Sequence, residues 1–324
     1  MNDRIFFDEY EQTNVGAVPD LSALAHEEIL PENSVLLKLT ISGCDFKKTI
    51  NSDDLVHDGD EIDSRLINAQ KRLIDKQYLK DIQKLDSHVR RMLYDIGFRP
   101  KFLGQGTVIT PLGVFNYTIS ILDRYEADRA VLIERLFERY EEAKRDVALR
   151  SPQTYCEDEY PTVDELREVF KVDRNFFSVS FPKVLEKLSE QAATDVYKNE
   201  KQKYNEQMNE AMTEIKQALR GGFVELVDGM LDKVRGIGTE RKVFREGFVE
   251  KWKIFLDTFD GKNLSNDTEL AALVAQARGV LSGVSPDNIK NSVETRINIE
   301  NSLSEIKNNL DGMIGNVKRK ARFA

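Results

Sequence analysis

Apolar residues recur at helical spacing in two long stretches of this chain. In each stretch they follow one another at steps of 4, 3, 4, 3 and 4 residues. Steps of this kind place side chains on one face of an α-helix. The first set comprises Tyr78, Ile82, Leu85, Val89, Met92 and Ile96, and the second comprises Ile299, Leu303, Ile306, Leu310, Met313 and Val317. The pattern predicts long helices over about 61–96 and 287–318, and therefore a mainly α protein.

The same spacing, together with helix-start signals, predicts further helices. They are expected at 124–147, at 163–170, from 184 to beyond 219, at 242–259 and at 267–281. Gly221 and Gly222 mark a candidate break in the longest of them. Asn266 or Asp267 is the expected N-cap of the helix that ends near Leu281.

Short β segments are expected between the helices. Residues 35–41 alternate in the manner of a strand, and 176–181 has the aromatic and β-branched content of a second strand that could pair with the first. Residues 107–109 and 114–115 suit short extended pieces around a turn at 111–113. These segments predict a small β-containing head.

One part of the longest helix is polar on every side. Residues 198–203 carry no apolar side chain, so this part must project into solvent or bridge two packed regions. We therefore expect an elongated helical bundle or coiled-coil-like body with the small head. The expected divisions are an acidic N-terminal arm (1–33), a mixed head with two long helices and short strands (34–182), and a long-helix C-terminal region (183–324).

Composition limits where the chain works and what it contacts. No apolar run reaches the ~18 residues of a membrane-spanning helix, and the acidic start lacks the features of a signal peptide. Only Cys44 and Cys156 are present, which fits a reducing, cytoplasmic compartment. The net charge of −9 argues against broad attraction to nucleic acid. The basic tail at 318–322 is more simply a favourable match for the negative end of the preceding helix.

Residues 102–122 contain no charged residue, although 32% of the chain is charged. One interpretation is a buried hairpin or loop that completes the small sheet, which is the usual place for uncharged β segments. The other is an apolar tongue that inserts into a membrane or a partner. On the second interpretation Val108, Leu112, Val114 and Phe115 are the interaction candidates of this stretch.

No catalytic or ligand-binding motif stands out. The histidines are not near one another or near a cysteine at metal-ligand spacing, and no nucleophile elbow or phosphate-binding loop is present. The acidic stretch at 53–61 lacks the spacing of a calcium loop and is better explained as a helix start. We therefore expect a protein that is not an enzyme, with no cofactor and no metal.

Several segments, taken in order, resemble a family of uncharacterised proteins encoded by phages and mobile elements. The resemblance lies in 36–41, in 71–74, in Arg91 followed by 97–104 with Val108 and Pro111, and in 177–182. It covers about the first 185 residues. Members of that family are often encoded beside a MoxR-type AAA+ ATPase and a von Willebrand factor A protein. The resemblance therefore implies an accessory protein in such a system, in a bacterial or phage-infected cell, and it brings no catalytic residues.

Three hypotheses about function follow. The first is a non-enzymatic helical interaction or scaffold protein that self-associates and acts with an AAA+ ATPase and a von Willebrand factor A partner. The second is a membrane-active protein that uses 102–122, and the third is a DNA-processing accessory protein that uses the basic tail. Beyond the uncharged stretch, the interaction candidates are Ile299, Leu303, Ile306, Leu310, Met313, Val317, Lys318, Arg319, Lys320 and Arg322.

Overall fold

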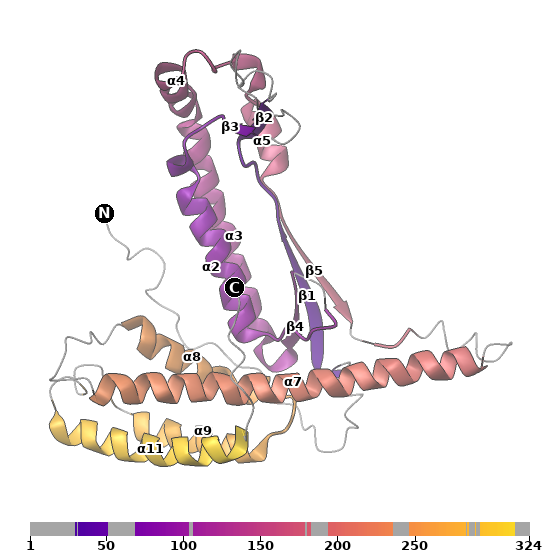
Figure 1. Ribbon diagram of the computed structural model, residues 1–324, viewed down its shortest axis with the longest axis vertical. Helices are drawn as coiled ribbons and strands as arrows, with labels where there is room; N and C mark the ends of the chain where they lie inside the picture. Colours follow the sequence, from indigo (N-terminus) through magenta and orange to yellow (C-terminus); the bar gives the residue numbers. More distant parts are fainter. Residues whose placement is uncertain are drawn as a thin grey trace, which may run out of the picture. The chain divides into compact units, whose positions relative to one another are not determined.

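The computed structural model describes residues 30, 32–50, 69–103, 106–178, 180–182, 194–235, 246–282, 284, 289 and 292–314. The described part is mainly helical with a small β portion, which confirms the predicted fold class (Figure 1). The strands are β1 (Ser34–Ile41), β2 (Lys47–Ile50), β3 (Ala69–Arg72), β4 (Thr107–Pro111) and β5 (Val172–Ser178). The α-helices are α2 (Lys80–Ile96), α3 (Phe115–Glu138), α4 (Tyr140–Arg150), α5 (Val163–Val169), α7 (Thr194–Arg235), α8 (Glu246–Lys262), α9 (Thr268–Leu281) and α11 (Val293–Ile314). Three short 3-10 helices are η3 (Lys76–Tyr78), η4 (Leu112–Val114) and η5 (Glu157–Glu159).

The strands form two small sheets. Three of them lie in the order β4-β1-β5, so the predicted pairing of the first strand with the later aromatic strand is confirmed. The backbone N–H of Ser42 donates to the carbonyl of Lys171 (2.9 Å), which places the end of β1 beside the start of β5. The second sheet is the antiparallel pair of β2 and β3, with Lys47 opposite Arg72. This pair was not predicted, because its lysine-rich strands lack the apolar alternation that marks a strand in a sequence.

Several predicted boundaries were wrong. The helix expected over 124–147 starts earlier, at Phe115, and is two helices, α3 and α4. The helix expected over 61–96 begins only at Lys80, because β3 and η3 come before it and the Asp75 side chain accepts from Gln77 N–H at the start of η3. Residues 114–115 are not extended: Pro111 leads into η4, and α3 starts at Phe115. Gly221 and Gly222 do not break α7, which runs through both residues. The residues that were expected to start the last helix at 287 lie outside the described ranges.

The described chain divides into two compact units, each assembled from separate stretches of sequence. Unit 1 contains 1–37, 94–118 and 176–324, and unit 2 contains 38–93 and 119–175. The divisions therefore fall within β1, α2, α3 and β5 and do not follow the boundaries expected at 33/34 and 182/183. Each unit has its own hydrophobic core.

The core of unit 1 lies between long helices. In Figure 1, α7 and α11 lie side by side, and α9 packs along α11. Trp252 of α8 is buried at 2% exposure, and its ring lies edge-on to Phe223 of α7, with centroids 5.9 Å apart. Phe255 stacks on the same phenylalanine at 5.4 Å. Leu30, Phe98 and Ile109, which come from much earlier in the chain, complete this cluster.

A contact between two glycines sets how closely α8 approaches η4. A Cβ atom added to Gly113 would lie 2.5 Å from the Cα of Gly261, and one added to Gly261 would lie 2.8 Å from the carbonyl carbon of Gly113. The two backbones touch, so a side chain at either position has no room.

Lys262, the residue after Gly261, is buried and donates to the carbonyl of Asp95 at 2.7 Å, near the end of α2.

The core of unit 2 is built on α2, α3, α4 and α5. Its apolar residues include Phe46, Ile82 of α2 and Tyr140 of α4. The ring of Tyr140 lies 5.7 Å from that of Phe46. A buried polar cluster joins α2 to α3. Arg129 donates to Asp86 at 3.0 Å and to the carbonyl of Ser42 at 2.6 Å, and the Tyr125 hydroxyl donates to Asp86 at 2.7 Å.

Candidate functional site

The predicted apolar seam of α11 is part of the core of unit 1. Ile299, Leu303, Ile306 and Leu310 are at most 2% exposed and belong to one cluster with α7 and α9, while Met313 packs against that cluster partly buried. The helical spacing was therefore predicted correctly. The seam is used inside the chain, so these four side chains are not a free surface for another molecule.

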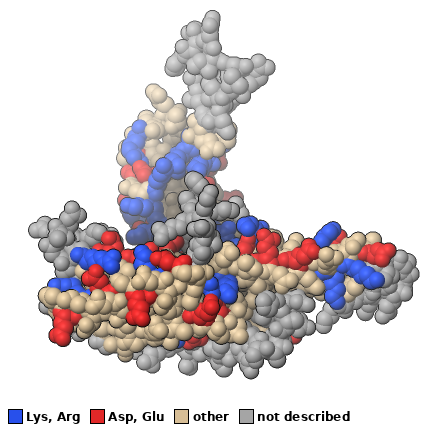
Figure 2. All heavy atoms as spheres, turned by 60° about the horizontal axis from the view of Figure 1, so that its bottom comes forward, with Lys and Arg blue, Asp and Glu red and all other residues tan. Residues whose placement is uncertain are grey.

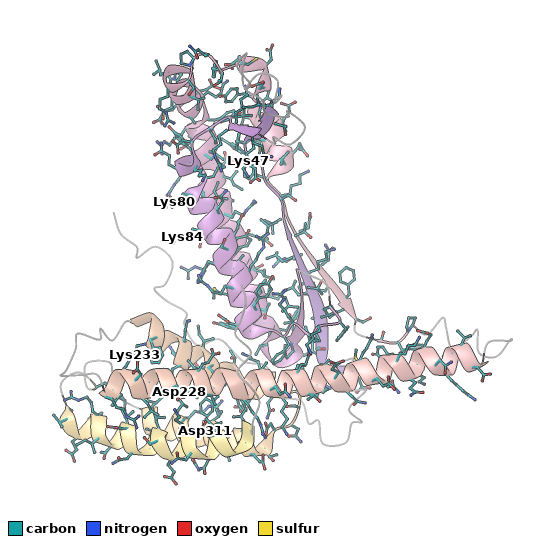
Figure 3. The ribbon with its side chains drawn as sticks, in the orientation of Figure 1. Lys47, Lys80, Lys84, Asp228, Lys233 and Asp311 are labelled. Atoms are coloured by element: carbon teal, nitrogen blue, oxygen red, sulfur yellow. The ribbon has the colours of Figure 1, made fainter. Side chains whose placement is uncertain are left out.

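Ion pairs hold α11 to α7 at the edges of this seam. Lys307 of α11 lies 2.5 Å from the carboxylate of Asp228 of α7, whose position is labelled in Figure 3. Arg235 of α7 donates to Glu300 of α11 at 2.7 Å. The pairing of these two helices thus combines a buried apolar seam with flanking charge pairs, as two neighbouring helices of a bundle commonly do.

The uncharged stretch is divided between buried and exposed residues. Val108 of β4 and Val114 of η4 are each 1% exposed, so both belong to the interior. Leu112 is 44% exposed, and Phe115 is partly buried with its ring edge-on to Phe176 at 5.4 Å. The stretch is therefore built into the fold through β4 and the start of α3, as the buried interpretation expects.

The first part of α7 is a length of exposed helix. From Asp195 to Gln207 no side chain is buried, whereas Met208, Ala211 and Met212 open the buried stripe that continues along the helix. Figure 2 shows acidic and basic side chains mixed along this helix. The expectation that 198–203 faces solvent is confirmed.

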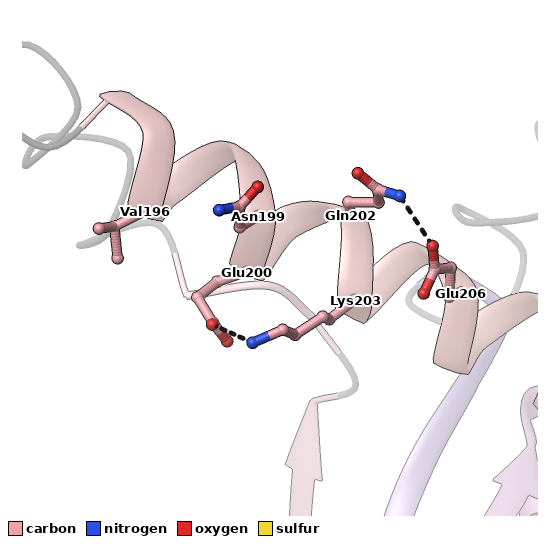
Figure 4. A pocket seen from close by; sticks show the side chains of 6 residues that line it. All are labelled: Val196, Asn199, Glu200, Gln202, Lys203 and Glu206. Carbon is pink, nitrogen blue, oxygen red and sulfur yellow. Dashed lines mark hydrogen bonds and ion pairs between the residues drawn. The ribbon is translucent and has the colours of Figure 1, made fainter.

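Local side-chain pairs stabilise this exposed part. Glu200 and Lys203 lie 2.6 Å apart, and Gln202 donates to Glu206 at 2.9 Å (Figure 4). With Val196 and Asn199, these residues line a wide, open hollow of about 400 Å³. Its lining is mostly polar, which is unlike the enclosed apolar pockets that bind small molecules.

An aromatic group lies on the same part of α7. The ring of Phe181 lies edge-on to Tyr197 at 5.7 Å and to Tyr204 at 5.5 Å. The two tyrosines are seven residues apart and so lie on one side of the helix. Burial raises the pKa of the Tyr204 phenol. On the neighbouring turn Val196 is 65% exposed, which leaves an apolar side chain in solvent.

Unit 2 gathers basic side chains that sequence reasoning did not single out. The elements β2, β3, η3 and α2 carry nine lysine or arginine residues and three aspartates, in a chain whose net charge is −9. Lys80 and Lys84 project from the same side of α2, one turn apart (Figure 3). The sequence does contain a sign of this basic side, because Lys76, Lys80 and Lys84 follow one another at four-residue steps.

A hollow of about 340 Å³ lies where the basic elements meet α4. Its rim carries Arg72, Lys76, Arg150 and Asp75, and its apolar lining comes from Ile74 and Val147. Both terminal nitrogens of Arg150 donate to one oxygen of Asp75 at 3.0 Å. The hydrogen bond from Gln77 N–H is the main reason that the pKa of Asp75 lies below its usual value, with Arg150 adding to it.

The residues that the structure describes contain no group of three or more histidine, cysteine, aspartate or glutamate side chains that could hold a metal ion. Burial raises the pKa of the Cys44 thiol, which makes this cysteine a poorer nucleophile. None of the described helices combines the length and apolar character needed to cross a membrane. The candidates Val317, Lys318, Arg319, Lys320 and Arg322, the acidic stretch 53–61 and most of the acidic arm lie outside the described residues.

Comparison with known proteins adds no family to this picture. No protein-family model, no curated protein and no solved structure matches the chain. A functional interpretation therefore depends on the surfaces of the molecule and on the resemblance of about its first 185 residues.

Proposed function

We propose that this chain is a non-enzymatic helical interaction protein that self-associates and serves as an accessory to an AAA+ ATPase system of a phage or mobile element. The observation that carries the interaction part is the exposed first part of α7, from Asp195 to Gln207. A helix with little tertiary packing over more than three turns is only marginally stable by itself in water. A partner that covers this part would supply the missing contacts.

A second copy of the chain fits this part of α7. Tyr197, Tyr204 and Val196 supply partly or fully accessible apolar groups, and the same turns carry both signs of charge. The link to an AAA+ ATPase and a von Willebrand factor A protein depends on the resemblance alone.

The mass of the protein in solution tests self-association. Light scattering coupled to gel filtration is expected to give a mass above the 37.2 kDa of one chain. The double variant Val196→Asp, Tyr197→Asp is expected to lower this mass to that of a monomer, because it places carboxylates in the proposed interface. A matched variant, Val131→Asp, alters a side chain that is 52% exposed in unit 2 and is expected to keep the mass unchanged.

A monomeric mass for the unmodified protein over the micromolar range would rule out the self-association. The partnership with an ATPase has its own test, which is co-purification with a MoxR-type AAA+ ATPase. Failure to bind such an ATPase in purified form, with and without ATP, would refute that part separately.

Two alternatives have less support. A membrane-active tongue made from 102–122 would have to extract Val108, Ile109 and Val114, each at most 1% exposed, from the core of unit 1. Leakage of dye from liposomes, compared between the unmodified protein and Leu112→Asp, tests it. A DNA-processing role through the basic tail predicts salt-sensitive DNA binding that is lost when 318–324 are removed.

A further inference from the structure

A charged feature of the described residues, outside the proposed self-association surface, is the basic side of unit 2. We propose that the hollow rimmed by Arg72, Lys76 and Arg150, together with the lysines that continue from it along α2, binds the phosphate backbone of a nucleic acid. This proposal is independent of self-association and of the basic tail.

The basic groups form a continuous track. Lys76, Lys80 and Lys84 follow one another at four-residue steps, and Arg91 lies on a later turn of the same helix. Four residues of helix rise about 6 Å, so the part of the track from Lys80 to Arg91 is about 16 Å long. All four side chains are exposed. The track therefore presents four exposed cations at steps of 4, 4 and 7 residues, which suits a ligand with negative charges repeated along a chain.

The hollow lies at one end of this track. Arg150 is 55% exposed and forms an ion pair with Asp75, which neutralises the aspartate. Arg72 and Lys76, both exposed, add positive charge beyond this pair. Asp146 is a second acidic neighbour, 4.0 Å from Arg150. Ile74 is buried, which places the charged groups around an apolar floor. The arrangement offers one site where a phosphate can approach several cations at once.

The composition of the track favours phosphates over an acidic protein. Protein interfaces are usually centred on buried aromatic or aliphatic anchors and are depleted in lysine. The residues that line the hollow include no large, exposed apolar side chain; Leu149, which precedes Arg150 and is 82% exposed, is not one of them. Backbone binding of nucleic acid, in contrast, is driven by lysine and arginine and the release of counterions.

The same composition predicts how the nucleic acid is held. Tyr78 lies beside the track, but it is partly buried, its hydroxyl donates to Asp146, and the guanidinium of Arg139 lies 4.9 Å from its ring centre. It is therefore engaged within the unit and not presented for base stacking. Contacts to phosphates alone carry no sequence information. We expect binding that depends strongly on salt and does not depend on base sequence.

Fluorescence anisotropy with a labelled 20-nucleotide single strand, and with its duplex, tests the proposal. In 50 mM salt the variant Lys76→Glu, Lys80→Glu, Lys84→Glu is expected to raise the Kd at least about tenfold. The slope of log K against log salt is expected to become smaller by about 3, one for each phosphate contact that is lost. Circular dichroism checks that the variant retains its helices.

A matched variant controls for the change in total charge. Lys38→Glu, Lys251→Glu, Lys253→Glu changes the net charge by the same amount at exposed positions of β1 and α8, outside the proposed self-association surface, and is expected to bind as the unmodified protein does. Removal of 318–324 is also expected to leave binding unchanged, which separates this surface from the tail. Equal weakening in both triple variants would overturn the proposal, since overall charge alone would then explain the binding.

Lysine footprinting on the unmodified protein gives a second measurement. The bound oligonucleotide is expected to protect Lys76, Lys80 and Lys84 from acetylation more than the exposed Lys251 and Lys253 of α8. Absence of binding at 50 mM salt, or equal protection of the two groups, contradicts the proposal. Competition by polyglutamate as effective as that by unlabelled oligonucleotide would assign the surface to acidic protein segments and refute the choice of nucleic acid.

Discussion

Arg220 of α7 holds Asp267, the N-cap of α9, through two hydrogen bonds. Its Nε lies 2.5 Å from Oδ2 and its Nη2 lies 2.9 Å from Oδ1, while Nη1 donates to the carbonyl of Met313 in α11 at 3.0 Å. The Asp267 side chain is 1% exposed, and it also accepts from the N–H of Leu270. One guanidinium thus joins three helices of unit 1. Burial acts to raise the pKa of Asp267, but these hydrogen bonds outweigh it and keep the pKa below its usual value.

Loss of the Arg220 guanidinium should destabilise unit 1 strongly. Arg220→Met leaves the buried carboxylate of Asp267 without its hydrogen-bonded charge partner, with only Lys216 remaining at 4.0 Å, and we expect a loss of about 3–5 kcal/mol in the free energy of unfolding. The measurement is urea unfolding followed by the fluorescence of Trp252, the one tryptophan of the chain. The double variant with Asp267→Asn should lose less than the sum of the two single variants, because the residues interact directly.

An exposed arginine in the same helix supplies the control. Arg235 is 55% exposed in its pair with Glu300, and Arg235→Met should cost less than about 1 kcal/mol. A cost for Arg220→Met no larger than that for Arg235→Met would show that the buried network does not stabilise α9.

A methyl group at the contact between η4 and α8 should be poorly tolerated. In Gly261→Ala the added Cβ would lie 2.8 Å from the backbone of Gly113, which cannot move as a side chain can. We expect a loss of about 1–3 kcal/mol, measured by the same urea unfolding.

Gly221→Ala is the counterpart, since an added Cβ there meets nothing within 4 Å. It should raise stability by up to about 1 kcal/mol through helix propensity. Equal effects of the two substitutions would mean that the backbones are not in contact.

The buried lysine of α8 should make unit 1 more stable at mildly alkaline pH. Desolvation lowers the pKa of Lys262 to about 8, against about 10.4 in an unfolded chain. Between these values the unfolded chain binds more protons than the folded one, so stability rises with pH. Urea unfolding at pH 7.5 and 9.5 should show this rise in the unmodified protein and not in Lys262→Met. The difference between the two proteins removes the contribution of groups that titrate in both. An equal rise in stability with pH in the two proteins would contradict the lowered pKa of Lys262.

The polar cluster of unit 2 separates a charge effect from a hydrogen-bond effect. Asp86→Ala leaves Arg129, whose side chain is 3% exposed, without its carboxylate, and we expect a loss of about 3–5 kcal/mol. Tyr125→Phe removes only one hydrogen bond to Asp86 and should cost about 1 kcal/mol. Chemical unfolding followed by circular dichroism measures both. Asp86→Ala is expected to lose more stability than Tyr125→Phe. A larger loss for Tyr125→Phe would contradict the dominant role of the charge pair.

Some of this structure follows directly from residue types and spacing. Asp267 is an N-cap because a short carboxylate can accept from the first turn of a helix, and one of the two candidates named from the sequence was correct. The seam of α11 follows from its heptad steps. Such features depend on residues close together in the chain, where the geometry of the helix relates spacing to position.

Features made by distant segments could not be read in this way. The start of α3 was missed because Tyr117, Ile121 and Tyr125, all buried, repeat at helical steps across the end of an uncharged run that also suits a strand. The basic hollow depends on Arg150 reaching Asp75 across 75 residues of sequence. Tertiary packing brings these groups together, and no local pattern records it.

The core of unit 1 combines early and late segments of the chain, and this limits when it can form during translation. Leu30, Phe98 and Ile109 share that core with residues from Met208 to Leu310. A ribosome releases these early residues long before their partners exist, so the core cannot close during most of translation. A nascent chain arrested before α11 would present the apolar faces of α7 and α9 to solvent, and it should therefore be a strong client for chaperones.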